Sequence, residues 1–386
     1  MNRLRQHTRY RFPWREQNRF TLLVDAPAFF TDMLQSIGQA TRFIYLEMYL
    51  IQSGAVVDRF LDALERARTR QIDIYLLLDD YGALGLNAVD RQRIRNMGIH
   101  LYFYNPLHYG SLRRNLFRDH RKIMIVDGRI AYTGGVGITD EFDPAHDPQL
   151  YWHDAMVRVE GQCAWDWQTL FEENWKRWAD REIQQKPPHF DIPEPVQAGR
   201  AVESRSFTHS EVVRSFVHHI RAAERRAWLA TAYFVPSRKL RRTLARAARN
   251  GTDVRIMLPG RHTDHPWARH MGRRFYERLL RDGVRIYEYQ PRFVHLKILL
   301  CDHWVSIGSS NVDRWNLRWN LEANQEVDDP DFALSIQRLL EQDLAECHEI
   351  LLEHWQHRSW HTRIRIWFWS KVVAFLSWFS LDRKGK

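Results

Sequence analysis

The sequence predicts an α/β protein built from two tandem, pseudo-symmetric halves, each a mostly parallel mixed sheet flanked by helices. Three observations support this prediction. Short apolar segments typical of buried strands alternate with segments whose apolar residues recur at helical spacing. The order of these segments in the first half recurs in the second half. Residues 186–195 contain four prolines, which is typical of a linker between the halves.

The first half contains four predicted strands separated by three predicted helices. Its second strand is an apolar run, which is typical of a strand buried on both faces. Its last strand stops before Pro106. In chain order, the predicted strands are 20–25, 42–51, 72–78 and 99–104, and the predicted helices are 28–40, 56–69 and 90–97.

The second half repeats this order, beginning with an apolar strand that matches 42–51. Its last strand also stops before a proline, Pro291. The predicted strands are 226–235, 253–258 and 284–289, and the predicted helices are 240–248 and 270–280. The repeat therefore predicts two domains, 20–185 and 201–360, joined by a linker at 186–200.

The first half carries an insert that the second half lacks. Pro106 and Pro291 are 185 positions apart, whereas the motif histidines described below are 175 apart, so the first half has ten additional residues before its motif. The insert lies within 108–118 and contains three arginines, Arg113, Arg114 and Arg118. It is either a solvated loop or a lid or phosphate contact beside the site.

Two segments, one in each half, share one pattern of polar residues. A His is followed two residues later by a Lys and five residues beyond that by an Asp, and a Gly-rich turn comes soon after. The residues are His120, Lys122 and Asp127 in the first half and His295, Lys297 and Asp302 in the second. Because side chains alternate across a strand, His and Lys face the same way. The aspartates complete the catalytic motif, although strand geometry turns them away and favours a structural role.

This pattern fits phosphate-ester chemistry and predicts no metal and no cofactor. A lysine on the same strand face repels a divalent cation, and no cluster of carboxylates compensates. The lysines would neutralise non-bridging phosphate oxygens. One imidazole can attack phosphorus while the other protonates the leaving alcohol and deprotonates the incoming one. The residues alone leave open which histidine takes which role.

With these motifs and the turns at 134–137 and 308–311, the sequence resembles the phospholipase D superfamily over residues 20–350. The tandem motifs, together with 14–23 and 311–324, resemble bacterial cardiolipin synthases. This resemblance implies a phosphohistidine intermediate, with His120 as the nucleophile and His295 as the acid and base. It also implies transfer of a phosphatidyl group between phospholipids, commonly two phosphatidylglycerols giving cardiolipin and glycerol.

The resemblance implies further site residues near the turns. Glu322 and Asp154 lie where the family places an acid that hydrogen-bonds the motif histidine, and a surface charge is the alternative reading of Asp154. Ser309 and Asn311 match the family's phosphate-binding positions. Gly137 stands where many members have Asn, so a full set of phosphate donors is in doubt in the first half.

Glu47 is an isolated acid in the apolar strand 42–51, and Thr231 stands 184 residues further on. An acid in such a strand must be paired or neutral when it is buried. Glu47 either supports the site or lies at a sheet edge and faces water.

Composition narrows the compartment and the partner. The chain has 57 Lys and Arg against 47 Asp and Glu, a net charge of +10, which favours an anionic partner, either nucleic acid or anionic lipid. Its three cysteines are few and widely spaced, which argues against a disulfide framework or a zinc site and favours a reducing compartment. The basic arm 1–19 has six arginines and no apolar run, so it is not a secretory signal. It is either solvated or bound to an anionic surface.

The predicted tail, 361–386, favours lipid over nucleic acid. Within it, 366–381 is mostly apolar, rich in Trp and flanked by cations, but it is shorter than the roughly 20 residues of a membrane span. This composition is typical of an interfacial anchor, with a core-packed helix and a true span as alternatives. We expect a peripheral protein on the cytoplasmic side of a bacterial membrane that binds anionic phospholipid. A hydrolytic phospholipase D, a nuclease and a non-catalytic membrane-binding protein are the alternatives.

Overall fold

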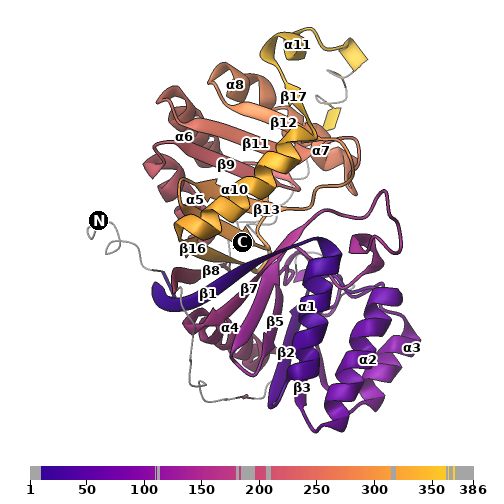
Figure 1. Cartoon of the computed structure of the whole chain (residues 1–386). Helices are drawn as coiled ribbons and strands as arrows, with labels where there is room; N and C mark the ends of the chain where they lie inside the picture. The colour runs from indigo at the N-terminus through magenta and orange to yellow at the C-terminus, as the bar shows by residue number, and fades with distance from the viewer. Residues whose placement is uncertain are drawn as a thin grey trace.

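The computed structural model describes residues 10–108, 110, 114–179, 182–183, 196–205, 210–313, 319–361, 364 and 368–369. Within these residues, fifteen strands form one continuous sheet. The first half of the chain builds one end of the molecule and the second half builds the other (Figure 1). The halves meet where β1 (Arg15–Val24) pairs antiparallel with β8 (Gln197–Ser204).

The first half supplies strands β1 to β7 and helices α1 to α4. From the sheet edge to the centre, the strand order is β4-β3-β2-β5-β6-β7-β1. The remaining strands are β2 (Phe43–Met48), β3 (Asp73–Asp79), β4 (His100–Tyr104), β5 (Lys122–Val126), β6 (Ile130–Gly134) and β7 (Ala155–Gly161). The helices are α1 (Asp25–Gln39), α2 (Ala55–Thr69), α3 (Ala88–Asn96) and α4 (Gln162–Ala179), with short 3-10 helices at Arg114–Leu116 and Asp140–Phe142.

The second half continues the sheet in the order β8-β16-β14-β13-β9-β11-β12-β17, while β10 and β15 form a separate parallel pair. Its other strands are β9 (Arg226–Thr231), β10 (Phe234–Val235), β11 (Asp253–Pro259), β12 (Arg285–Tyr289), β13 (Lys297–Cys301), β14 (Trp304–Gly308), β15 (Val312–Asp313), β16 (Glu322–Asp328) and β17 (Cys347–Ile350). The helices are α5 (Glu211–Ala222), α6 (Arg238–Arg249), α7 (Pro266–Arg273), α8 (Tyr276–Arg281), α10 (Pro330–Ala345) and α11 (Leu352–Gln356).

The predicted α/β class with tandem, pseudo-symmetric halves is confirmed, because the strand order of one half mirrors that of the other. Thus β5 corresponds to β13, and β2 to β9. Within the main sheet, parallel pairing is confined to β2-β3-β4 and β9-β11-β12, so most of its strand pairs are antiparallel rather than parallel as predicted. The motif strands β5 and β13 pair antiparallel with both neighbours. For β6 and β14 this follows from connections that are too short for a parallel crossover.

One apolar core joins the two halves. It lies between the sheet and helices α4 and α10, and it contains residues from both halves. The ring of Phe20 on β1 contacts that of Phe332 on α10, with centroids 6.1 Å apart. Trp167 on α4 donates its indole N–H to Gln325 Oε1 on β16 at 2.8 Å. Two further cores, one in each half, bury the other face of the sheet.

The two central strands begin earlier than predicted. Residues 15–19 of the predicted arm belong to β1, and residues 197–200 of the predicted linker belong to β8. Polar side chains at the start of β1 made residues 15–19 look like part of the arm, but these side chains have partners elsewhere in the fold. Arg15 pairs with Asp166 on α4 at 2.8 Å, and buried Asn18 accepts the N–H of Cys163 at 2.7 Å.

Two predicted elements of the second half are divided. The helix predicted at 270–280 is α7 followed by α8, and the strand predicted at 226–235 is β9 followed by β10. Thr231 Oγ1 donates to Tyr233 O at 3.1 Å and accepts the N–H of Val312 at 3.2 Å. These bonds help lead the chain out of the main sheet toward β15.

Some predictions concern residues outside the described part of the chain. These are the first nine residues of the arm, most of the linker and nearly all of the tail beyond residue 361. In the ranges given above, no helix is both long enough and apolar enough to cross a membrane.

Candidate active site

The two motif histidines lie where the halves meet. His120 comes two residues before β5, and His295 comes two residues before β13. The main chain of each is bonded to the opposite half: the N–H of His120 donates to Leu321 O at 3.0 Å, and that of His295 donates to His153 O at 2.7 Å. Each histidine is therefore held by one half directly against the other.

Each imidazole is also bonded by an acid from the opposite half. Nδ1 of His120 lies 3.1 and 3.2 Å from the two carboxylate oxygens of Glu322, at the start of β16. Nδ1 of His295 lies 2.7 Å from Asp154 Oδ2, just before β7. Both acids are fully buried. An N–H at Nδ1 donated to a carboxylate leaves the lone pair on Nε2, the nitrogen that can react. The family resemblance pointed to both acids but did not show that they cross between the halves.

The two lysines turn back toward the histidines of their own motifs. Nζ of Lys122 donates to His120 O at 2.5 Å, and Nζ of Lys297 donates to His295 O at 2.6 Å. Nζ of Lys297 also lies 3.0 Å from Nδ1 of the His295 ring and 3.8 Å from Asp154 Oδ2. Burial lowers the pKa of both lysines, and that of Lys122 falls to about 7. A bound phosphate diester would favour the ammonium forms through its negative charge.

Burial also sets the protonation of the histidines. It lowers the pKa of His120, against the opposing effect of Glu322. At His295 burial and the nearby Lys297 act together, so the pKa lies well below its ordinary value. Both imidazoles are thus neutral near pH 7, the form in which Nε2 can attack phosphorus or accept a proton.

The Gly-rich turns occupy the space beside the acids. A Cβ at Gly135 would collide with Asp154 Oδ2 and lie 2.7 Å from Nζ of Lys297, so this close approach needs glycine. At the matching position of the second half, Ser309 Oγ donates to Glu322 Oε2 at 2.5 Å. The hydroxyl predicted to bind phosphate is therefore committed to orienting the acid.

Asn311 differs from Ser309 in having unused hydrogen-bonding capacity. It is 1% exposed, and neither polar atom of its side-chain amide has a partner within the described residues. Buried polar atoms without partners cost free energy. An amide of this kind can donate to a phosphate oxygen, and phosphate binding by Asn311 stays a prediction.

Aromatic rings, which the sequence reasoning missed, surround the two histidines unequally. The ring of Tyr49 lies 4.7 Å from that of His120. His295 has three aromatic neighbours at 5.2 to 5.7 Å: Trp152, Phe293 and Phe142. Trp152 stands two residues before the site acid Asp154, and Phe293 stands two residues before the motif histidine His295. Strand alternation at those positions was the signal that could have identified them.

Asp127 and Asp302 lie at the opposite ends of β5 and β13 from the histidines. Each occupies a left-handed turn, with φ of 56° and 52°. Their carboxylates accept main-chain N–H groups at 2.7 to 3.0 Å, from Thr41, Arg42 and Phe43 in the first half and Glu224, Arg225 and Arg226 in the second. This placement gives both aspartates a structural role, because they hold the neighbouring strand and contact no reacting group.

Glu47 supports the first motif strand from the face opposite His120. Its Oε1 lies 2.6 Å from Nη2 of Arg121 and 3.2 Å from Nδ2 of Asn174. Arg121 and Asn174 both bond Asp119 as well, at 3.1 and 2.8 Å. Burial raises the pKa of Glu47 well above its ordinary value, against the opposing charge of Arg121. Glu47 thus neither faces water nor contacts a histidine.

The second half has no such charged network at the matching positions. Strand pairing aligns Glu47 with Ala230, because these residues pair with Ile123 and Ile298. The match to Thr231 inferred from sequence spacing is therefore wrong by one residue. The apolar residues that replace the network are Ala230, Val294 and Leu296.

The described arginines of the insert bond within the first half. Buried Arg118 lies 3.4 Å from Asp79 Oδ1 and donates to Asn105 O at 3.0 Å. Arg114 donates to Asn105 Oδ1 at 3.2 Å. Arg113 lies outside the described residues. Arg118 is therefore buried and bonded within its own half rather than solvated.

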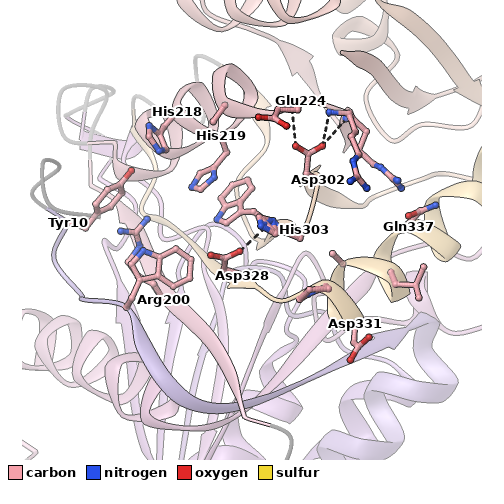
Figure 2. Close-up of a pocket in the computed structure, with 18 residues that line it drawn as sticks. Tyr10, Arg200, His218, His219, Glu224, Asp302, His303, Asp328, Asp331 and Gln337 are labelled. Atoms are coloured by element: carbon pink, nitrogen blue, oxygen red, sulfur yellow. Dashed lines mark hydrogen bonds and ion pairs between the residues drawn. The ribbon is translucent and has the colours of Figure 1, made fainter. Parts of the chain in front are cut away.

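A cavity of about 900 Å³ lies at the other end of β13, beside the turn that contains Asp302 (Figure 2). Its wall includes His218 and His219 on α5, and the ring of His219 stacks on that of Trp304 at 3.8 Å. No motif histidine or lysine lines this cavity. Among the residues that the structure describes, no group of three or more His, Cys, Asp or Glu could hold a metal.

A family model and the related proteins both point to the same family. The family described as "Cardiolipin synthase, PLD-like domain" matches residues 33–157 and 216–344, one match in each half. Cardiolipin synthase B of Salmonella typhimurium is 31% identical over 357 residues, covering 90% of this chain and 86% of that protein. Cardiolipin synthase of Clostridium perfringens strain 13 is 28% identical, covering 90% and 75%.

A solved structure shows the same fold over nearly the whole chain. Phosphatidylserine synthase of Haemophilus influenzae Rd KW20 aligns with a TM-score of 0.72 at 15% identity, covering 97% of this chain and 96% of that one. The resemblance inferred from the paired motifs is confirmed by these matches. The chain belongs to the cardiolipin synthase family of phospholipase D-like proteins.

Proposed function

We propose that this protein is a phosphatidyltransferase of the cardiolipin synthase type. It moves a phosphatidyl group from one phospholipid to the hydroxyl of another, so that two phosphatidylglycerols give cardiolipin and glycerol. The observation that carries this proposal is the pair of crossed contacts, His120 with Glu322 and His295 with Asp154, each beside a buried lysine. The related cardiolipin synthases indicate the substrate class.

In the first step, Nε2 of His120 attacks the phosphorus of the donor lipid. The new P–N bond forms as the P–O bond to the glycerol headgroup breaks, and His295 gives its proton to the leaving oxygen. The phosphate charge raises the pKa of His295 above its value in the empty site, which allows His295 to carry that proton. Lys122 and Lys297 neutralise the non-bridging oxygens.

In the second step, the hydroxyl of the acceptor lipid gives its proton to His295 and attacks phosphorus. The P–N bond breaks and releases His120 unchanged. Asp154 stabilises the imidazolium that forms on His295. The three aromatic rings around His295 make the proton-transfer site apolar, which favours a lipid hydroxyl over water.

Exposed apolar side chains at the end of the second domain and the start of the tail support binding to a lipid surface. Trp360, Ile364 and Phe368 are 63%, 52% and 51% exposed. Exposed apolar and aromatic side chains suit the headgroup region of a membrane, and the net charge of +10 favours anionic lipid. We therefore propose peripheral binding to an anionic phospholipid membrane, on the cytoplasmic side of a bacterial cell.

The test is mass spectrometry of lipids after the purified protein is incubated with phosphatidylglycerol liposomes in EDTA. Cardiolipin formed at the expense of phosphatidylglycerol, and lost in His120→Ala and His295→Ala, is the expected result. His218→Ala, in the separate cavity, is the matched control. Phosphatidic acid as the sole product would make the protein a hydrolytic phospholipase D. Absence of any lipid product together with cleavage of DNA would make it a nuclease.

A further inference from the structure

His153 lies beside the site acid Asp154 and bonds carboxylates through both ring nitrogens. Nδ1 lies 2.8 Å from Asp25 Oδ1, at the start of α1 in the first half. Nε2 lies 3.0 Å from Asp343 Oδ2, on α10 in the second half. The side chain is 3% exposed, so the two carboxylates take the place of water.

These two contacts fix the charge of the ring. An ionised carboxylate only accepts hydrogen bonds, so both nitrogens of His153 must carry a hydrogen, which makes the ring an imidazolium. Burial acts to lower the pKa of His153, but Asp25 and Asp343 outweigh it and raise the pKa to about 9. Geometry and electrostatics therefore agree on the charged form.

One more charge completes the His153 cluster, which consists of His153, Asp25, Asp343 and Arg292. Nη2 of Arg292 lies 2.8 Å from Asp25 Oδ2 and 3.3 Å from Nδ1 of His153. Two cations thus face two carboxylates, and a neutral His153 would leave the buried carboxylate of Asp343 without its cation. Further titratable groups around the cluster are Asp154, Tyr151, Tyr289, Glu346 and Cys347.

The cluster fixes a short segment whose two ends both contact His295. His153 O accepts the N–H of His295 at 2.7 Å, and the N–H of His153 donates to Phe293 O at 2.9 Å. The preceding residue, Trp152, places its ring 5.2 Å from that of His295. The following residue, Asp154, bonds Nδ1 of His295 at 2.7 Å.

The other half lacks this arrangement. Parallel bridges pair His153 with Val294 and Leu321 with Asp119, so Leu321 is the counterpart of His153. A leucine at this position is enough to present Glu322 to His120. The ionic anchor therefore serves His295 alone.

We propose that His153 is a positioning residue for His295: as an imidazolium held between Asp25 and Asp343, it fixes residues 152–154 and thereby orients the Asp154–His295 pair. This inference rests on the proposed function for the role of His295. It assigns to His153 an effect on turnover rather than on binding, because His153 contacts neither lysine nor the phosphate-facing side of the imidazoles. It also makes that effect dependent on pH.

The first test measures protonation without requiring activity. Two-bond ¹H–¹⁵N NMR of the full-length, ¹⁵N-labelled protein, with His153→Asn used for assignment, reports both ring nitrogens. Two protonated nitrogens at pH 7.5 and a change as the pH passes through about 9 are expected. A neutral ring at pH 7.5 would overturn the proposal, whether or not the protein proves to make cardiolipin.

The second test measures turnover with phosphatidylglycerol vesicles. His153→Leu, which copies the residue of the other half, is expected to lower kcat about 100-fold through misplacement of the acid pair while leaving KM nearly unchanged. His219→Leu, in the separate cavity, controls for the replacement of a half-buried histidine by leucine. Equal kcat in the two variants would refute the positioning role.

The third comparison keeps the proposal testable even when His153→Leu does not fold. His153→Arg keeps a cation that can bond both carboxylates and does not titrate below pH 12. It is expected to restore most of kcat at pH 7.5 and to retain a larger fraction of that kcat than the wild type between pH 8.5 and 10, since any loss of protons from Lys122 and His295 is common to both proteins. If kcat falls with rising pH in the same way in the wild type and in His153→Arg, the proposal is contradicted.

Discussion

Replacing Asp154 by Asn should impair His295, although the two residues belong to different halves. Asp154 Oδ2 lies 2.7 Å from Nδ1 of His295, and both side chains are buried. A charge-assisted hydrogen bond in such a place contributes about 1.5–3 kcal/mol, and Asn removes the charge that stabilises the imidazolium. At about 1.4 kcal/mol per tenfold change, kcat with phosphatidylglycerol should fall roughly 10- to 150-fold.

The assay that isolates this effect compares two donor lipids. Phosphatidyl-p-nitrophenol has a leaving group that is stable as an anion and needs no proton, so its first step does not require the acid. Stopped-flow release of nitrophenolate should therefore proceed in Asp154→Asn at nearly the wild-type rate. Glu322→Gln should stay slow with both donors, because Glu322 bonds the nucleophile His120.

The refuting results are distinct. If Glu322→Gln recovers with the nitrophenol donor and Asp154→Asn does not, the roles of the two histidines are reversed. If Asp154→Asn and Glu322→Gln respond alike to the change of donor, the Asp154–His295 and Glu322–His120 pairs do not have separate roles in acid catalysis and nucleophilic attack. The wild-type enzyme with both donors, at equal vesicle concentration, is the control for lipid presentation.

Three further predictions follow from the same geometry. Lys122→Ala and Lys297→Ala should each lower kcat about 10²–10³-fold with an unchanged urea midpoint, and near-normal turnover in both would contradict neutralisation of the phosphate. Arg121→Leu should cost about 3–5 kcal/mol of unfolding free energy because Glu47 and Asp119 lose their buried cation. A triple variant that adds Glu47→Ala and Asp119→Val to Arg121→Leu should recover most of this lost free energy. If urea unfolding shows the same loss in the single and the triple variant, the charges of Arg121, Glu47 and Asp119 are not coupled. The folded-state pKa of His153 is raised, so its stabilising contribution is complete below about pH 6.5 and is lost as pH rises through about 9; parallel urea-stability profiles for wild type and His153→Arg would contradict this.

The sequence identifies the reacting groups because their signal is local. A His and a Lys two residues apart on a strand must share a face, and the repeat makes the coincidence improbable. Both site acids, Asp154 and Glu322, followed from the family resemblance, which places an acid at these positions. The crossing of these acids could not be predicted, since it depends on the bridges that join residue 119 to 321 and residue 294 to 153. No spacing within either half encodes those bridges.

The errors in the sequence reasoning also have a common physical cause, which is that polar side chains find partners far along the chain. Residues 15–19 of β1 were assigned to the arm because Arg15 and Asn18 break the apolar alternation, yet Asp166 and Cys163 bond these side chains. Ser309 matched a phosphate-binding position, but its hydroxyl bonds Glu322. Residue type predicts that a group can form a hydrogen bond, and only the fold decides with which partner.

The two halves share one backbone plan but support their histidines by different means. His120 is backed by the charged network around Arg121, and His295 is backed by the His153 cluster and three aromatic rings. The proposed reaction requires such a difference, because the nucleophile must stay neutral and fixed while the acid and base changes charge twice in each turnover. Two identical surroundings would give both histidines the same pKa and let them compete for both roles. The assignment of roles in this fold therefore depends on residues behind the motifs rather than on the motifs themselves.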